Sequence, residues 1–503
     1  MYAKTFGITL CGIKPILVEI EVALSRGLPS FQIVGLPDQS VNESKERISL
    51  ALNSIKAKKP NSLPYRTSVN LAPAEIKKEG PQLDLPIALA YLQASGQIKN
   101  LPKDFFFLGE LGFDGSLKKV KGVLPMLLLG KELNFKKVIV PKENEREAGL
   151  VEGLEIYALE DLKKVVDFLE GKILIEPVAK SENFVDKEED VPLLLDPILE
   201  RVVLISASGR HNLLLAGPPG TGKSLIAQEI KSILPNLSYE ESLEISKIYS
   251  ALGILDELLL RPPFRNPHHS ASSVSILGGG KDAKPGEVTL AHLGILFFDE
   301  LPEFRRDVLE GIREPLETGQ ITVSRAKEKI TYPAKFLFLA SMNPCPCGFY
   351  GDQEKECVCK VGEIQKYRKK ISGPILDRID LLFWLPRMKS EKMFSLSEKK
   401  LSSLRNKVVE ISERMKRRFQ EEKFKFNSEI PHHKIKTYIK LDYESETFLR
   451  RAIDNYQLSL RSVHKILRVA LTIADIENKD KIETSHLAEA LQYKLSENIF
   501  GEG

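Results

Sequence analysis

Residues 212–224 read NLLLAGPPGTGKS, and this stretch decides the fold of the middle of the chain. Four apolar residues precede a glycine-rich loop of the form G-x-x-x-x-G-K-[ST], and the residues after it, Leu225 to Ile233, have helical spacing. A strand, a loop of this form and a helix in this order are typical of a phosphate-binding loop. We therefore predict an α/β domain that binds a nucleotide.

The loop residues have distinct predicted roles. The glycines let successive backbone N–H groups turn toward phosphate oxygens at the start of a helix. Lys223 supplies a mobile positive charge for the β- and γ-phosphates, and Ser224 places a hydroxyl on Mg²⁺. We expect all eight residues to bind ATP: Gly217, Pro218, Pro219, Gly220, Thr221, Gly222, Lys223 and Ser224.

Two later apolar runs end in polar side chains that suit hydrolysis. Gly294 to Phe298 runs into Asp299 and Glu300, and Phe336 to Ser341 leads to Asn343. We predict that Asp299 holds Mg²⁺ and that Glu300 polarises the attacking water as the general base. The amide of Asn343 would orient this water or contact the γ-phosphate, and an ordinary turn asparagine is the competing interpretation.

The order of these strands resembles the AAA+ class of ATPases. The resemblance covers residues from about 200 to 385 and puts Asn343 in the sensor-1 position. Alternating residues on both sides of 325–328 predict a hairpin similar to the pre-sensor-1 hairpin of MCM-type helicases and magnesium chelatases. That likeness implies that Arg325 and Lys327 face DNA phosphates in the pore of a hexamer. A solvated hairpin tip is the alternative.

Two arginines resemble AAA+ residues that act at the nucleotide. Ser372 to Leu381 is similar to the segment that carries the arginine finger, which implies that Arg378 reaches the γ-phosphate of a neighbouring subunit. Catalysis would then require an oligomer. Local pairing of Arg378 with Asp377 or Asp380 is the competing interpretation.

Arg461 lies where related proteins have a sensor-2 arginine, which implies contact with the nucleotide. Lys465 and Arg468 share its helix face, so a solvated basic face is the alternative. A basic run from Arg387 to Lys440 contains 16 Lys or Arg against 7 Glu. This run suggests a DNA-binding surface, although solvated helix faces are also commonly basic.

Four of the five cysteines lie close together in the sequence. Cys345-x-Cys347 and Cys357-x-Cys359 are separated by nine residues. Four thiolates on one loop favour a structural Zn²⁺ site, but the C-x-C spacing is tighter than usual, so reduced loop thiols remain an alternative. His268 and His269 have no third ligand in the sequence, and we interpret them as a hydrogen-bonded structural pair.

The composition indicates a folded chain with balanced charge. Its 503 residues include 73 Lys and Arg against 69 Asp and Glu, for a net charge of +4, and 42% are hydrophobic. These values exclude a disordered or collagen-like chain, and they are too even for net charge alone to indicate nucleic-acid binding. No apolar run is long enough to span a bilayer, and the first residues lack a signal-peptide pattern. We expect a cytoplasmic protein.

Changes in hydrophobic pattern predict three domains and one linker. Residues 1–174 mix alternating strands, such as Ile16–Val22, with helices such as Leu85–Ala94, and predict an α+β domain. Residues 175–195 are polar and predict a linker. Residues 196–386 form the predicted ATPase domain, and helical spacing dominates in residues 387–503.

Taken together, residues 212–224, 264–270, 285–304, 343–348 and 372–381 resemble the ComM/YifB family of magnesium-chelatase-like AAA+ proteins. The resemblance covers nearly the whole chain. It implies that residues 1–174 are similar in fold to the proteolytic domain of Lon and that residues 387–503 are a helical lid. A Lon-type serine would follow Gly80 and Pro81, but Gln82 stands there, which opposes a protease.

The resemblance also implies a function. Family members are similar to hexameric, ATP-dependent motors that drive branch migration of DNA in homologous recombination and natural transformation. ATP and Mg²⁺ would be the cofactors, and branched or single-stranded DNA and recombination proteins the partners, with no membrane involved. The alternative is a magnesium-chelatase-like, protein-remodelling ATPase.

Overall fold

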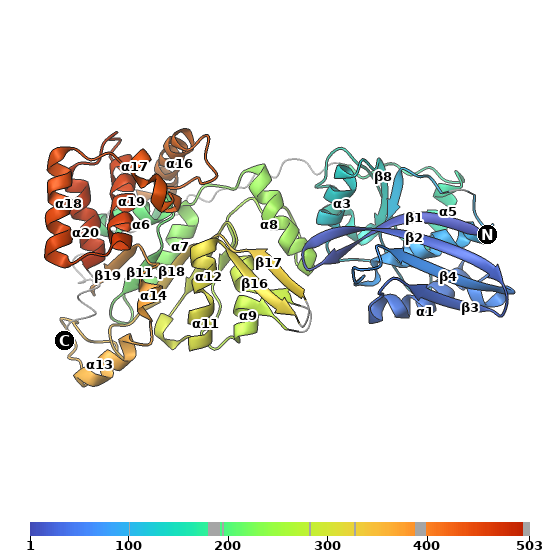
Figure 1. Ribbon diagram of the computed structural model, residues 1–503, viewed down its shortest axis with the longest axis horizontal. Helices are drawn as coiled ribbons and strands as arrows, with labels where there is room; N and C mark the ends of the chain where they lie inside the picture. The colour runs from blue at the N-terminus through green and yellow to red at the C-terminus, as the bar shows by residue number, and fades with distance from the viewer. Residues whose placement is uncertain are drawn as a thin grey trace. The chain divides into compact units, whose positions relative to one another are not determined.

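The structure is a computed structural model that describes residues 1–99, 101–179, 192–193, 196–280, 283–325, 328–387 and 399–495. The chain divides into two compact units (Figure 1). The first contains Met1–Asp186 and Tyr239–Leu259, and the second contains Lys187–Ser238 and Leu260–Gly503. Among the described residues, no helix is long and apolar enough to cross a membrane. Most of the predicted linker 175–195 lies outside the described residues.

The first unit begins with a four-stranded sheet in the order β1-β2-β4-β3. Its strands are β1 (Tyr2–Cys11), β2 (Lys14–Arg26), β4 (Tyr65–Ala72) and β3 (Ser30–Val34). Helices α1 (Gln39–Ser54) and α2 (Asp84–Ala94) complete this part. Because α2 is buried on nearly every side, its residues are apolar all round rather than along one stripe. The strands and helices predicted here are confirmed.

A second, parallel sheet of the first unit has the order β5-β8-β9. It consists of β5 (Phe105–Phe107), β8 (Lys137–Pro141) and β9 (Glu155–Leu159), followed by α5 (Leu162–Leu169). The short strands β6 (Glu110–Leu111) and β7 (Leu117–Lys118) pair with each other. Helices α3 (Val123–Glu132) and α4 (Glu145–Ala148) lie between these strands in the sequence.

Helix α8 (Tyr239–Leu252) packs against α3 in the first unit, although it follows the phosphate-binding loop in the sequence. Glu147 links the two helices: its buried carboxylate accepts hydrogen bonds from the backbone N–H of Leu124 (3.0 Å) and from the hydroxyl of Ser250. Burial raises the pKa of Glu147. Residues 239–259, which the sequence places within the ATPase domain, thus cluster with the amino-terminal unit.

The second unit contains a five-stranded parallel sheet in the order β12-β15-β18-β11-β19. The strands are β12 (Phe264–Arg265), β15 (Ile295–Phe298), β18 (Leu337–Met342), β11 (Leu213–Ala216) and β19 (Leu381–Trp384). Every residue of β11, β15 and β18 is buried, as expected for strands covered on both faces. The predicted parallel sheet is confirmed. Its carboxyl edge carries the residues described below.

The strands of this unit alternate with helices and short turns. The helices between α6 (Pro197–Gly209) and the hairpin are α7 (Lys223–Ile233), α9 (Ser273–Leu277), α10 (Glu287–Leu290), α11 (Arg306–Gly311) and α12 (Arg313–Thr318). Strands β16 (Gln320–Arg325) and β17 (Glu328–Pro333) form an antiparallel hairpin, which confirms the prediction. Two more helices, α13 (Val361–Arg368) and α14 (Gly373–Leu376), precede β19.

Helices predominate after residue 400. They are α16 (Leu401–Arg418), α17 (Ile435–Tyr438), α18 (Tyr443–Tyr456), α19 (Leu460–Ile476) and α20 (Thr484–Leu495). Their apolar residues belong to the same core cluster as those of α6, α7 and the parallel sheet. The helical segment is therefore packed into the second unit.

Candidate functional site

The glycine-rich loop joins β11 to α7 at the carboxyl edge of the sheet. Gly220 and Gly222 have φ angles of 80° and 86°, which other residues rarely adopt. The buried Lys223 begins α7, and its ammonium donates hydrogen bonds of 2.8 Å to the carbonyl oxygens of Gly217 and Pro218. The loop thus turns around the lysine ammonium at the start of α7, and a helix start is a position that favours phosphate binding.

The predicted magnesium ligands lie in direct contact. Asp299 directly follows β15, and its carboxylate accepts a hydrogen bond of 2.9 Å from the hydroxyl of Ser224. Ser341 on β18 donates to the other carboxylate oxygen. Hydroxyl and carboxylate oxygens are the ligands that Mg²⁺ prefers, so the donor set fits this ion.

Asn343 lies beside the lysine, as the sequence predicts for a sensor-1 residue. Its side-chain oxygen accepts a hydrogen bond of 3.2 Å from the ammonium of Lys223. Strand β18 is the immediate neighbour of β11, so the parallel sheet brings the residue after β18 to the start of α7. The role of Asn343 at a γ-phosphate stays a prediction.

Burial lowers the pKa of Lys223 to about 8, while the negative charges of Asp299 and Glu300 act in the opposite direction. The ammonium has little water around it, which favours the neutral amine. Lys223 is therefore protonated at neutral pH, but a smaller rise in pH neutralises it than neutralises an exposed lysine.

Glu300 has a positive φ of 56° and a side chain that is 51% exposed. Its backbone N–H donates to the hydroxyl of Ser341 (3.1 Å), and its carboxylate lies 3.7 Å from Nδ1 of His269. The rings of His268 and His269 pack against each other with centroids 4.2 Å apart, and His268 bonds to Ser270 (2.7 Å), but the interpretation as a structural pair is incomplete because His269 also faces Glu300. The contact of His269 with Glu300 follows from strand pairing: β12, which precedes His269, pairs with β15, which precedes Glu300.

Arg378 and Arg461 converge on one carboxylate. Arg378 forms an ion pair with Glu317 and also donates to the carbonyl of Pro374 (2.6 Å), and its side chain is 9% exposed. Arg461 reaches the other oxygen of Glu317 at 3.4 Å. These hydrogen bonds lower the pKa of Glu317, the one from Arg378 most strongly. Arg378 is thus paired within the chain, but with Glu317 rather than Asp377 or Asp380.

The alternative of a solvated basic face around Arg461 is wrong. Lys465 is buried and donates to the carbonyl of Ile379 (2.7 Å). Arg468 donates to the carbonyl of Ile430, and burial lowers the pKa of Arg468. Arg468 therefore links two parts of the helical segment, and Lys465 links α19 to the turn before β19.

The basic run on α16 divides into two faces. Arg414 and Arg418 bind the fully buried carboxylate of Asp475 on α19, with a distance of 2.7 Å from Nη1 of Arg418. Lys416 and Arg417 are exposed. Of these four side chains, Lys416 and Arg417 are available for a polyanion. The side chain of Arg325 and the whole of Lys327, at the tip of the hairpin, lie outside the described residues.

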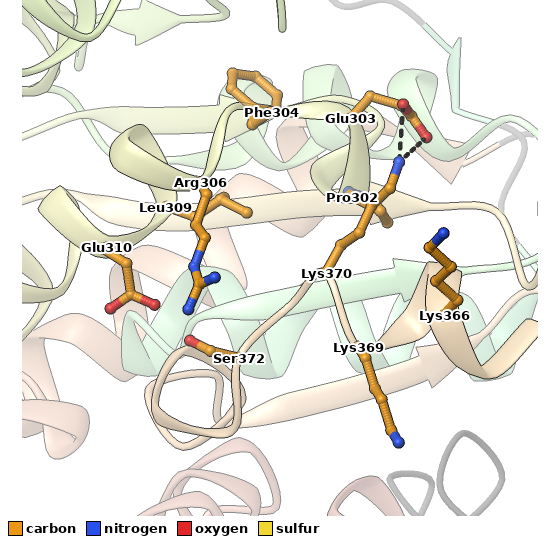
Figure 2. A pocket seen from close by; sticks show the side chains of 10 residues that line it. All are labelled: Pro302, Glu303, Phe304, Arg306, Leu309, Glu310, Lys366, Lys369, Lys370 and Ser372. Atoms are coloured by element: carbon orange, nitrogen blue, oxygen red, sulfur yellow. Dashed lines mark hydrogen bonds and ion pairs between the residues drawn. The ribbon is translucent and has the colours of Figure 1, made fainter.

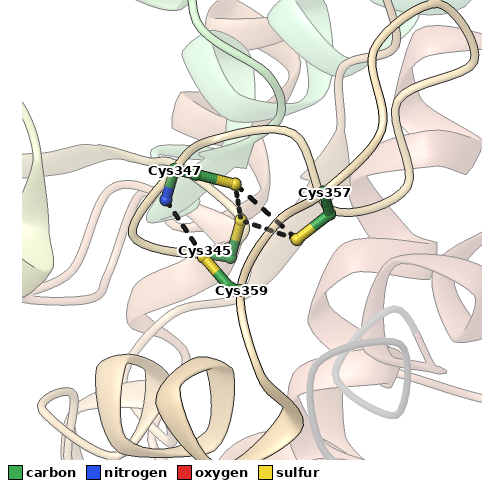
Figure 3. Close-up of side chains that lie close together, drawn as sticks. All are labelled: Cys345, Cys347, Cys357 and Cys359. Carbon is green, nitrogen blue, oxygen red and sulfur yellow. Dashed lines mark hydrogen bonds between the residues drawn. The ribbon is translucent and has the colours of Figure 1, made fainter.

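The four cysteines converge (Figure 3), and their sulfur atoms all lie within 4.8 Å of one another. The Sγ atoms of Cys345, Cys347 and Cys357 are 3.4 to 3.7 Å apart. A tetrahedral site with Zn–S bonds of about 2.3 Å requires sulfur separations of about 3.8 Å. The cluster could therefore hold a metal ion.

A separate hollow of about 470 Å³ lies beside the turn Leu301–Glu303, which follows Glu300 (Figure 2). Lys370 at its rim pairs with Glu303 at 3.2 Å. The hollow is lined by Pro302, Glu303, Phe304, Arg306, Leu309, Glu310, Lys366, Lys369, Lys370 and Ser372. None of the predicted nucleotide-binding residues lines it, so it is distinct from the phosphate-binding loop.

In the first unit, Gln82 occupies the place where a Lon-type protease would have its serine. Gln82 is buried, and its amide donates to the hydroxyl of Thr9 (2.8 Å) and to the carbonyl of Glu79 (2.7 Å). A buried, hydrogen-bonded amide cannot serve as a nucleophile. The geometry agrees with the sequence argument against a protease.

Three family models match the chain. The model described as magnesium chelatase, subunit ChlI, matches residues 197–393. The model for subunit ChlI of Mg-chelatase matches residues 20–144, and the ChlI C-terminal model matches residues 398–494.

Similar proteins cover almost all of the chain. The competence protein ComM of Haemophilus influenzae is 38% identical over 497 residues, which is 96% of this chain and 95% of that protein. YifB of Escherichia coli is 37% identical over 97% of this chain and 96% of its own length. Lon protease 2 of Bacillus subtilis is 27% identical over 33% of this chain and 31% of its own.

Proposed function

The chain belongs to the ComM/YifB family of magnesium-chelatase-like AAA+ proteins, and from this premise we propose that it is an ATP-driven DNA motor. The proposed ATPase activity rests on one observation: four side chains lie in contact, in two pairs, at one edge of the parallel sheet. Lys223 bonds to Asn343, and Ser224 bonds to Asp299. Glu300 follows Asp299 and exposes its carboxylate there.

These residues support a consistent hydrolysis mechanism. Lys223 and the loop N–H groups bind the β- and γ-phosphates, and Ser224 with Asp299 would hold Mg²⁺, which neutralises phosphate charge. Glu300 accepts a proton from the attacking water as the water oxygen forms a bond to the γ-phosphorus. The bond from that phosphorus to the β–γ bridging oxygen breaks, giving ADP and phosphate. Asn343 orients the water.

The proposed assembly is a homohexamer in the cytoplasm. Arg378 would act on the γ-phosphate of a neighbouring subunit, with Arg461 as a sensor-2 residue, and Glu317 sets the position of both arginines. The hairpin β16–β17 would present Arg325 and Lys327 to branched or single-stranded DNA. The name of the competence protein ComM supports a role in natural transformation, and we extend this to homologous recombination with recombination proteins as partners.

The test is steady-state ATP hydrolysis by the wild-type protein and Glu300→Gln, measured without DNA, with duplex DNA and with a synthetic four-way junction. We expect the junction to stimulate the wild type and Glu300→Gln to lose about 100-fold or more in kcat. Binding of a fluorescent ATP analogue by both proteins serves as the folding control. Equal hydrolysis by the two proteins would refute the assignment of Glu300.

A protein-remodelling ATPase of the magnesium-chelatase type is the second candidate, because the matching models are named for a chelatase subunit. It predicts hydrolysis that does not respond to DNA. The double variant Arg325→Ala/Lys327→Ala separates the two candidates further. In a DNA motor it should keep its hexamers and basal hydrolysis but lose junction unwinding.

We also propose that the cysteine cluster holds a structural Zn²⁺ ion. The sulfur separations and the all-thiolate donor set support zinc over harder metals. Metal analysis of the purified protein should give about one zinc per chain, and Cys357→Ser should lose it.

A further inference from the structure

The four cysteines lie on the segment that follows the sensor-1 strand. Residues 343–360 connect β18 to α13 and contain no helix or strand. A connection of this length without regular structure is uncommon in a compact domain, and fixing each residue costs about 1–2 kcal/mol of entropy. Most side chains after Cys347 are exposed or half-buried, so packing alone gives little compensation. A cross-link through a metal would supply the missing constraint.

One side of this segment lies against the nucleotide site. Cys345 is buried two residues after Asn343. Gly348 has a φ of 86°, and a Cβ there would lie 2.8 Å from the ring of Pro219 in the phosphate-binding loop and 4.0 Å from the amide carbon of Asn343. The turn that carries two of the thiols therefore contacts both the loop and the sensor amide.

The other side lies against the strand that leads to the helical segment. A Cβ at Gly351 would be 3.3 Å from the indole ring of Trp384 at the end of β19. The carboxylate of Asp352 accepts a hydrogen bond of 3.2 Å from Arg387. The cysteine loop thus spans from the sensor amide to the start of the connection to α16.

Backbone and side-chain groups already support the thiols. The N–H of Tyr350 lies 3.3 Å from the sulfur of Cys345, and the N–H of Cys347 lies 3.4 Å from the sulfur of Cys359. Hydrogen bonds of this kind orient metal ligands in structural sites. Arg368 donates to the carbonyl of Pro344 (3.1 Å), which brings a positive charge toward a site whose four thiolates exceed the charge of Zn²⁺ by two.

We infer that the zinc–thiolate loop positions Asn343 for hydrolysis, so that the metal controls catalysis without contacting the nucleotide. This inference rests on the proposed ATPase function. Cys345, Cys347, Cys357 and Cys359 are positioning residues that act through Asn343. Loss of the metal releases the turn at Gly348, and the sensor amide then loses its fixed place beside Lys223.

The experiment compares full-length wild type with Cys357→Ser, Asn343→Ala and the double variant, measuring zinc content, kcat and the Kd of a fluorescent ATP analogue. Cys357→His is the conservative variant, because three thiolates and an imidazole still bind zinc. Cys11→Ser, in the first unit, is the matched control. Should Cys357→Ser fail to fold, chelation of zinc from the wild type followed by readdition of Mg²⁺ gives the same comparison.

We expect Cys357→Ser to lose zinc and about tenfold or more in kcat, while the Kd changes by less than about threefold. Cys357→His should retain both zinc and kcat. Because the cysteines act through Asn343, the double variant should be no slower than Asn343→Ala alone, which is the signature of coupled residues. Cys11→Ser should match the wild type.

If Glu300→Gln is inactive, the proposed ATPase site stands, and three results would overturn the inference alone. These are wild-type protein that contains no zinc, a zinc-free variant with wild-type kcat, and losses of kcat that multiply in the double variant. Glu300→Gln hydrolysis equal to wild type would instead refute the proposed ATPase site and the inference with it.

Discussion

Lys223 shows how burial makes a single charge sensitive to pH. Its pKa is lowered to about 8, and nucleotide phosphates bind the protonated form. The protonated fraction of the free protein then falls from about 0.9 at pH 7 to about 0.1 at pH 9. We expect the affinity for ATP to fall about tenfold over this interval.

Titration with a fluorescent ATP analogue between pH 6.5 and pH 9.5 measures this effect. Lys223→Arg is the control, because a guanidinium stays protonated throughout and should bind with a flat pH profile, whatever its absolute affinity. A wild-type affinity that does not change up to pH 9.5 would contradict the lowered pKa.

His269 faces the predicted general base and provides the second test at this scale. Its ring nitrogen lies 3.7 Å from the carboxylate of Glu300. A protonated imidazole at this distance would attract the carboxylate by about 0.2–1 kcal/mol and hold Glu300 beside the histidine. We expect His269→Ala to raise DNA-free hydrolysis by about 1.5-fold to fivefold. His268→Ala removes the hydrogen bonds with Ser270 and the ring contact with His269 but no contact with Glu300, so it should leave the rate unchanged. A decrease in His269→Ala would show that the histidine assists Glu300.

Glu317 binds both Arg378 and Arg461, the two arginines proposed to act at the nucleotide. In Glu317→Ala, Arg378 and Arg461 lose their shared partner, and we expect kcat to fall about tenfold, as misplaced catalytic groups commonly do. Binding of nucleotide should change little. Glu314→Ala, an exposed carboxylate on the same helix, is the control for ATPase assays. Unchanged kcat in Glu317→Ala would exclude a positioning role.

The residues that meet at the edge of the parallel sheet could be picked out because each follows a recognisable local pattern. Lys223 and Ser224 belong to one motif, and Asp299 follows a run of apolar residues. Glu317 could not be predicted, since its two contacts connect residues 61 and 144 positions apart in the sequence. His269 was missed because β12 has two residues and gives almost no periodic signal.

At the scale of elements, the prediction concerns how the arginines of helix α16 contribute to stability. Arg418→Ala breaks part of an ion pair with Asp475, whose side chain is fully buried, and we expect a loss of about 3 kcal/mol in the free energy of unfolding. Urea denaturation followed by the fluorescence of Trp384, the only tryptophan, measures it. Arg417→Ala on the exposed face should keep stability and reduce the salt dependence of DNA binding. Equal stability of both variants would contradict the division of the helix into two faces.

At this scale the sequence predicted elements well where apolar periodicity was strong. The strands β11, β15 and β18 and the hairpin β16–β17 lie where expected. The basic run on α16 was misleading, because charge alone does not distinguish Arg418, which binds a buried carboxylate, from Arg417, which faces solvent.

At the scale of the whole molecule, we expect the packing of α8 in the first unit to stabilise α3. Ser250→Ala removes a donor from the buried Glu147, which costs about 1–3 kcal/mol. We expect faster hydrogen exchange at the amide of Leu124 on α3, with unchanged unfolding as reported by Trp384 in the second unit. Lys247→Ala on the same helix is the control. Unchanged exchange at Leu124 would show that α8 does not stabilise α3.

The chain passes between the two units three times, after residues 186, 238 and 259, and this order governs how the protein emerges during translation. At about 5–20 residues per second, synthesis of the 73 residues from 187 to 259 takes about 4–15 s. For that interval the surface of α3 lacks α8, and a nascent-chain chaperone could bind it. The phosphate-binding loop is therefore synthesised before the last residues of the amino-terminal unit.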